Sequence, residues 1–137
     1  MIWSVGKPEQ VTYWAVTGST ALCWSMMIAA PRSRVTARVM GSASPLILGG
    51  LALVHAGAIA AGGARPADLV SPEAMRRSTA RPAGFAAVWA HMLAFDLLAG
   101  RRVWQDGLRD GRDTRAALLV IWGAGPLALL LYPRLRA

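Results

Sequence analysis

The segment of residues 85–100 constrains the fold of this chain most strongly, because it is apolar over the length of a long helix. Within it only His91 and Asp96 can ionise, and it is followed directly by Arg101 and Arg102. An apolar helix that ends in paired arginines is typical of a membrane span meeting the lipid headgroups. An ionisable side chain inside a bilayer is costly and usually faces the interior of a helix bundle. His91 and Asp96 are therefore candidates for a functional site.

Composition favours a membrane protein over a soluble one. The 137 residues are 55% hydrophobic and 16% charged, and the apolar residues come in long blocks. The net charge of +8 comes from short basic clusters between these blocks, which suits lipid headgroups and argues against a nucleic-acid partner. The single cysteine, Cys23, excludes a disulfide framework. We expect one membrane domain over residues 1–137, with no metal and no cofactor.

Four apolar blocks predict an all-α polytopic membrane protein, a compact bundle of four transmembrane helices. A signal peptide is the alternative for the first block, but a run of about 20 residues is long enough to span the bilayer. Pro31, directly after two alanines, would also obstruct cleavage. Glycines and a proline at residues 123–126 predict a kink in the last block. The predicted spans are residues 11–31, 44–64, 84–104 and 115–132.

The connections differ in length. Arg32, Arg34 and Arg38 are expected to lie in a short basic loop after the first span. In the longest connection, residues 65–82, prolines limit any helix to a short piece around Pro72 to Thr79. Basic residues are divided almost equally between the two sides of the membrane, so the charges beside the first span decide the orientation. We predict that the first and third loops are cytoplasmic and both termini lie outside.

Depth along the helices tests whether the polar residues could meet. At about 1.5 Å per residue, His91 lies about 9 Å and Asp96 about 16 Å from the start of the third span. On the antiparallel second span His55 lies about 13 Å from the same side, and Trp24 on the first span about 20 Å. His91 and Asp96 are five residues apart, about 140° around the helix, so His91 faces either a different neighbour or the edge of the same cavity.

Asp96 has two interpretations. Without a partner in lipid its carboxyl would be driven toward the neutral form, whereas a nearby arginine would keep it ionised. Arg101 and Arg102 are badly phased for Asp96 on the same helix. The better candidate partners are Arg32, Arg34 and Arg38, which enter from the loop on the same membrane side. Either Asp96 fastens two helices by a polar contact, or it is an acid in a reactive site.

The third and fourth spans together resemble the abscisic-acid-deficient-four-like membrane family. The similarity covers nearly the whole chain and is strongest from Ala87 to Pro126. The residues that carry it are Trp89, His91, Leu93, Asp96, Leu97, Ala99, Arg101 or Arg102, and Val103 to Leu108, with Thr114-Arg115, Gly125-Pro126, and Trp24 to Ile28 leading to Pro31.

The resemblance implies a function in carotenoid chemistry. Plant members of the family are associated with making neoxanthin from violaxanthin, so a carotenoid or related terpenoid is the expected ligand. Opening an epoxide needs a proton donor at oxygen, and forming an allene needs a base at a neighbouring carbon. Asp96 is the expected acid, and His91 or His55 the expected base. The residues expected to contact the substrate are Trp24, Trp89, Arg101 and Arg102.

Two other classes of function stay open. The protein is either a non-catalytic carotenoid- or lipid-binding subunit of a membrane complex, with a membrane protein as partner, or a small proton-linked carrier. Four spans without a visible internal repeat argue against the carrier. The alanine, arginine and glycine bias is typical of a bacterial genome rich in G and C. The expected location is therefore a bacterial inner membrane, with lipid as the surrounding partner.

Overall fold

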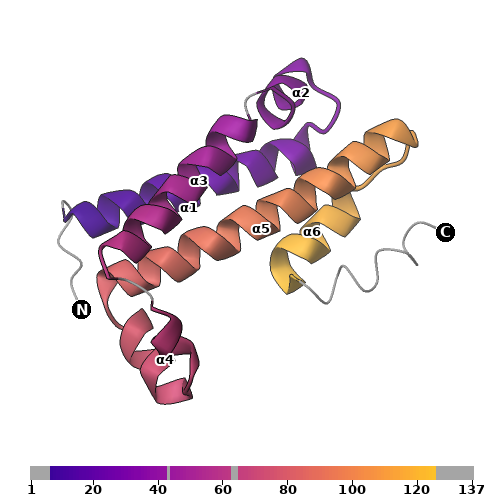
Figure 1. Ribbon diagram of the computed structural model, residues 1–137. Coiled ribbons are helices and arrows are strands. Elements are labelled where there is room, and N and C mark those ends of the chain that lie inside the picture. The colour runs from indigo at the N-terminus through magenta and orange to yellow at the C-terminus, as the bar shows by residue number, and fades with distance from the viewer. Residues whose placement is uncertain (1–6, 43, 63–64, 126–137) are drawn as a thin grey trace. The chain divides into compact units, whose positions relative to one another are not determined.

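The computed structural model describes residues 7–42, 44–62 and 65–125, and in this part of the chain every regular element is helical (Figure 1). The all-α prediction is therefore confirmed. The chain divides into two compact units. The first unit comprises the residues up to Ser19 and Leu46–Ala94, and the second comprises Thr20–Pro45 and the residues from Phe95 onward. The elements are α1 (Pro8–Ala29), α2 (Arg34–Met40), α3 (Ser44–Ala60), the 3-10 helix η1 (Pro66–Leu69), α4 (Pro72–Thr79), α5 (Pro82–Arg109) and α6 (Arg115–Ala124).

The four predicted spans coincide with α1, α3, α5 and α6, with shifted ends. Helix α5 is longer than predicted because it continues past Arg101 and Arg102 into a polar last turn. Helix α6 ends at Ala124, where Gly125 takes a φ of 52°. The remainder of the predicted fourth span, including Pro126 of the expected kink, lies outside the described residues.

One helix in the described ranges, α5, is long and apolar enough to cross a membrane by itself. Helices α2 and α3 pass the same test only when they are taken together as one broken span. Helix α6 is apolar but has 10 residues within the described part. By length and composition, the described residues thus contain one helix that could cross a membrane, and the four-span arrangement stays a prediction.

The prediction that Arg34 and Arg38 lie in a loop is wrong, because residues 34–40 form α2. Ser33 caps this helix, since its side chain accepts a hydrogen bond from the backbone N–H of Thr36. The Thr36 hydroxyl in turn lies 2.7 Å from the carbonyl oxygen of Ala30, near the end of α1. The same carbonyl oxygen also accepts a 3.1 Å hydrogen bond from the backbone N–H of Ser33, so two hydrogen bonds join the end of α1 to the start of α2.

Helix α4 agrees with the predicted short helix in the long connection. Its first residue is Pro72, a favourable position because proline has no N–H to leave unpaired in the first turn. Ser71 caps it through a 3.1 Å hydrogen bond from the backbone N–H of Ala74. The preceding helix η1 was not predicted.

The second unit is built around a tryptophan packed against a glycine. Trp24 is 1% exposed, and a Cβ atom at Gly100 would overlap its ring. Further along α5, a Cβ at Gly107 would overlap Thr114, at the start of α6. Figure 1 shows α6 beside the C-terminal part of α5. The two glycines thus allow close packing of neighbours onto α5.

Candidate functional site

Two histidines that are far apart in the sequence meet in the first unit. The ring centroids of His55 in α3 and His91 in α5 are 5.1 Å apart. His55 Nδ1 lies 2.8 Å from the backbone carbonyl oxygen of Ala87 in α5. Because a carbonyl oxygen only accepts hydrogen bonds, Nδ1 carries the hydrogen and the neutral ring keeps its lone pair on Nε2. The geometry thus gives His55 one defined basic nitrogen.

An aromatic cluster in the first unit joins α5, the helix of His91, to α1. Trp89 stacks on Phe85, with ring centroids 5.9 Å apart and planes inclined by 14°. It also stacks on Tyr13 of α1, at 5.7 Å. Sequence reasoning singled out Trp89 alone, although the four-residue spacing of Phe85 and Trp89 could have indicated the pair. Flat aromatic faces of this kind suit a conjugated hydrocarbon.

Trp89 also joins two helices. Its Nε1–H donates a 2.8 Å hydrogen bond to the hydroxyl of Thr17 in α1. The hydrogen bond of His55 therefore joins α3 to α5, and the hydrogen bond of Trp89 joins α5 to α1. These two contacts fix the orientation of both side chains.

A shallow apolar groove runs between α1 and α3 in the first unit. Its volume is about 240 Å³, and small residues such as Ala15 and Gly50 make the room. Val54, the residue before His55, lines it as well. A groove of this lining suits a hydrocarbon chain better than a polar ligand. Its lining residues are Ala15, Val16, Ser19, Leu46, Ile47, Gly50, Leu51 and Val54.

Asp96 belongs to the second unit and is half-buried. Its carboxyl makes no hydrogen bond or ion pair with any residue that the structure describes. Of its candidate partners, Arg32 instead donates to the carbonyl oxygen of Gly111, at 3.2 Å. Arg34 and Arg38 form no ion pair with Asp96 in the described ranges. The polar contact required by the fastening interpretation is therefore not found in this part of the chain.

Trp24, also in the second unit, is a core residue. Its ring stacks on Trp122 of α6, with centroids 6.2 Å apart. The predicted depth of Trp24, near the level of Asp96, agrees with its packing at Gly100, one helical turn further along α5. Its burial leaves little surface with which to contact a substrate.

Arg101 and Arg102 have structural contacts in the second unit. Arg101 Nε donates a 2.6 Å hydrogen bond to the carbonyl oxygen of Met40, the last residue of α2. Arg102 Nε lies 3.5 Å from Asp106, a buried carboxylate that also pairs with Arg109. Sequence reasoning missed this pairing, although arginines four residues before and three after Asp106 indicate it.

The histidine pair is not part of a larger group of metal-binding side chains. Among the described residues, no three His, Cys, Asp or Glu side chains lie close enough to hold a metal ion. Of the predicted catalytic residues, the structure thus brings His55 and His91 together, while Asp96 belongs to the other unit.

Comparison with known protein families identifies the family of the chain. The sequence model of the family described as ABA DEFICIENT 4-like matches residues 11–132. The chain belongs to this family. The match includes every helix from α2 to α6 and all of the candidate site residues. Searches of curated proteins and of solved structures found no match.

Proposed function

We propose that this ABA DEFICIENT 4-like chain is a multi-pass membrane protein that binds a carotenoid or related terpenoid and acts on it by acid–base chemistry. The observation that carries the proposal is the His55–His91 pair, in which the hydrogen bond to Ala87 leaves His55 Nε2 as the basic nitrogen. Membership in the family and the stacked aromatic rings of α1 and α5 support the choice of ligand.

The exposed side chains support a lipid environment. Leu46 and Leu53 of α3 are 78% and 75% exposed, and large apolar side chains are also exposed on α1, α5 and α6. Soluble proteins rarely leave contiguous apolar surface uncovered, whereas lipid covers it at no cost. The apolar part of α5, residues 82–100, is about 28 Å long, close to the thickness of a hydrocarbon core. We therefore propose four spans in a bacterial inner membrane, with both termini outside.

The proposed reaction is the isomerisation of an epoxide to an allene. A proton reaches the epoxide oxygen as its C–O bond breaks, and a base removes a proton from a neighbouring carbon whose C–H electrons form the new double bond. Atoms and electrons balance without an oxidant or reductant. His55 Nε2 supplies the base. Asp96 keeps the role of proton donor that was predicted for it from the sequence.

A non-catalytic role is the second candidate function. It is favoured by the hydrogen bonds of His55 and Trp89, since each of them joins two helices. In this case the histidine pair holds the helices together, and the protein presents a bound carotenoid or lipid to a partner in a membrane complex.

The His55→Asn variant separates the two roles. An asparagine amide N–H can replace the Nδ1–H donor to Ala87, but asparagine has no basic nitrogen. The full-length protein in nanodiscs would be incubated with violaxanthin, which carries epoxides, and with β-carotene, which carries none. Retained pigment would be measured by absorbance and products by chromatography. If His55 is the base, His55→Asn should unfold at the wild-type temperature and lose conversion by on the order of 100-fold.

His55→Phe is the matched variant, because it removes both the donor and the base. It should lose thermal stability as well as conversion. Conversion by His55→Asn at the wild-type rate would remove His55 from the reaction. Pigment that the wild type retains but leaves unaltered would instead favour the non-catalytic role.

A further inference from the structure

The connection that leads into α5 combines arginines with exposed apolar side chains. Residues 65–81 contain four arginines against the two carboxylates of Asp68 and Glu73. Leu69, the last residue of η1, and Val70, which follows it, are 72% and 82% exposed. Figure 1 shows η1 and α4 next to each other, directly before the start of α5. We call residues 65–81 the interfacial segment.

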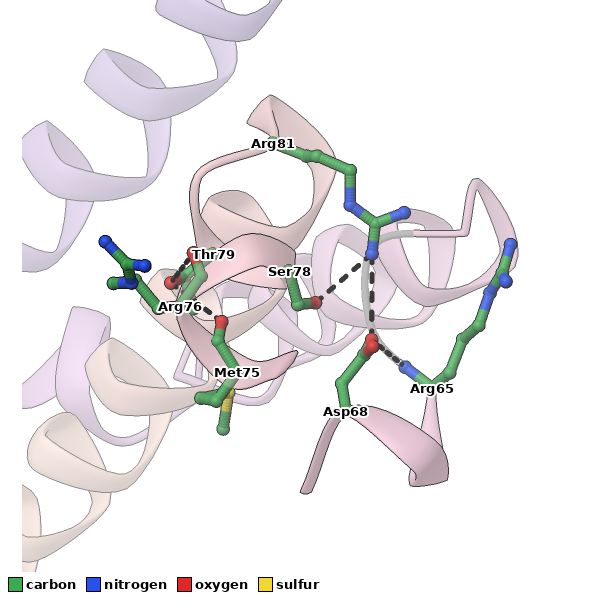
Figure 2. Close-up of polar contacts among 7 residues, drawn as sticks. All are labelled: Arg65, Asp68, Met75, Arg76, Ser78, Thr79 and Arg81. Atoms are coloured by element: carbon green, nitrogen blue, oxygen red, sulfur yellow. Dashed lines mark hydrogen bonds and ion pairs between the residues drawn. The ribbon is translucent and has the colours of Figure 1, made fainter. Parts of the chain in front are cut away.

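A polar network around Asp68 fixes the interfacial segment (Figure 2). The Asp68 carboxylate accepts a 2.9 Å hydrogen bond from the backbone N–H of Arg65 and lies 3.6 Å from the Arg81 guanidinium. Arg81 also donates to the hydroxyl of Ser78, at 3.3 Å. Hydrogen bonds from the Arg65 backbone and from Ser78 lower the pKa of Asp68, so this carboxylate stays charged at neutral pH. The network joins η1, α4 and the start of α5.

Arg76 and Arg77 are left outside this network. Both are exposed in the last turn of α4, and neither forms an ion pair with a described residue. Figure 2 shows the Arg76 guanidinium on the side of α4 away from Asp68 and Arg81. These two arginines therefore supply the excess positive charge of the interfacial segment.

We infer that the interfacial segment lies in the headgroup region of the bilayer and binds anionic phospholipids, with Arg76 and Arg77 on the phosphates and Leu69 and Val70 in the acyl boundary. The inference rests on the proposed membrane span of α5, whose apolar part begins directly after Arg81. The headgroup region of a bilayer suits both the arginines and the exposed apolar side chains, because it offers phosphate charges to the first and adjacent hydrocarbon to the second. An acidic protein surface would leave Leu69 and Val70 without apolar contact.

The experiment measures which lipids lie beside the interfacial segment in the full-length protein. A fluorophore is attached to Leu69→Cys in a Cys23→Ala background, and the protein is reconstituted in nanodiscs. The lipids are phosphatidylcholine and phosphatidylglycerol, either of which carries a nitroxide quencher high on its acyl chain. We expect quenching by both labelled lipids, with a clear preference for labelled phosphatidylglycerol.

Removal of the two unpaired arginines should abolish this preference. A lysine or arginine near an anionic membrane surface is worth about 1 kcal/mol, so Arg76→Gln with Arg77→Gln should reduce the phosphatidylglycerol preference by about 30-fold. Arg112→Gln with Arg115→Gln is the matched control. It removes the same charge from arginines that pair with Asp110 and Asp113, and it should leave the preference unchanged.

A second labelled position separates this inference from the proposed membrane location. Phe95, in α5, is exposed, and a fluorophore at Phe95→Cys should be quenched by nitroxides deep in the acyl chains. Quenching at position 95 without quenching at position 69 would overturn the interfacial segment alone. An equal preference for phosphatidylglycerol in the wild type and in the Arg76 and Arg77 variant would overturn the role of these arginines. Absence of quenching at both positions would contradict the membrane span and the inference that rests on it.

Discussion

At the level of single residues, Asp96 is the carboxylate whose surroundings differ most from those of the other acids in α5 and the following loop. Asp106, Asp110 and Asp113 all pair with arginines, whereas Asp96 has no hydrogen bond or ion pair within the described chain. The sequence already indicated Asp96, because an acid in an apolar helix needs an explanation. It could not indicate the absence of a partner, since that depends on which arginines other helices bring near.

Asp96→Asn tests the acid role directly. The amide keeps the shape and hydrogen-bonding capacity of the side chain but cannot donate a proton to an opening epoxide. Loss of conversion on the order of 100-fold is expected, with near-normal folding. Conversion would be measured by chromatography and folding by thermal unfolding of the same preparation.

The outcome separates catalysis from fastening. Interhelical hydrogen bonds in membranes average about 0.6 kcal/mol, so a fastening residue would lose little stability on this change and conversion would survive. An Asp96→Asn variant that converts substrate, or keeps its pigment effect in cells, at the wild-type level would end the acid hypothesis.

Gly100 tests the packing of the second unit. Gly100→Ala places a methyl group where the buried Trp24 ring lies, so α5 or the ring must shift. Overpacking of this kind costs about 1–3 kcal/mol, and thermal unfolding in detergent should detect it. Gly49→Ala in α3 is the control, because nothing lies within 4 Å of a Cβ there. The control should be neutral or slightly stabilising, and an equal loss in both variants would contradict the packing argument.

At the level of elements, local signals predicted α4 but not α2. Three prolines confined a helix in the long connection to Pro72–Thr79, and the structure has it there. Residues 34–40 contain two exposed arginines, Arg34 and Arg38, directly after the first apolar block, and this pattern predicts a basic loop. Helix α2 depends on the Ser33 cap, which the local sequence could indicate. It also depends on the hydrogen bond from the Thr36 hydroxyl to the end of α1, which the local sequence could not indicate.

Thr36→Val should therefore loosen α2. Thr36 is fully buried, and its hydroxyl lies 2.7 Å from the carbonyl oxygen of Ala30 and 3.3 Å from that of Met26. Valine keeps the shape but removes the hydroxyl's hydrogen bonding to the end of α1, which costs about 0.5–1.5 kcal/mol, while each of the two carbonyls keeps a backbone N–H donor. Hydrogen exchange of the α2 amides should speed up. Thr12→Val is the control, because its hydroxyl bonds a carbonyl at an exposed site, and an effect as large there would contradict the explanation.

At the level of the whole molecule, the sequence predicts the helical fold and the family better than it predicts which side chains pair with one another. The all-helical fold and the family both follow from features that extend along the chain. Depth arithmetic placed His55 between His91 and Asp96, and the structure sets it beside His91. Depth along the helices could not decide whether His55 lies beside His91 or beside Asp96. That depends on how each helix is rotated about its axis, and packing determines this rotation.

Cysteine accessibility on the two sides of α5 tests the central claim, that α5 crosses the membrane and carries the histidine pair within it. Glu73 and Arg112 are exposed before and after α5, whereas Ser78 is buried and would be a poor probe. Each of Glu73→Cys and Arg112→Cys would be made in the full-length protein with Cys23→Ala and treated with an impermeant maleimide in cells whose outer membrane has been opened. We predict labelling of Glu73→Cys before the inner membrane is permeabilised and of Arg112→Cys only afterwards. The reverse pattern would keep the span and invert the orientation, and labelling of both positions from the same side would contradict the claim.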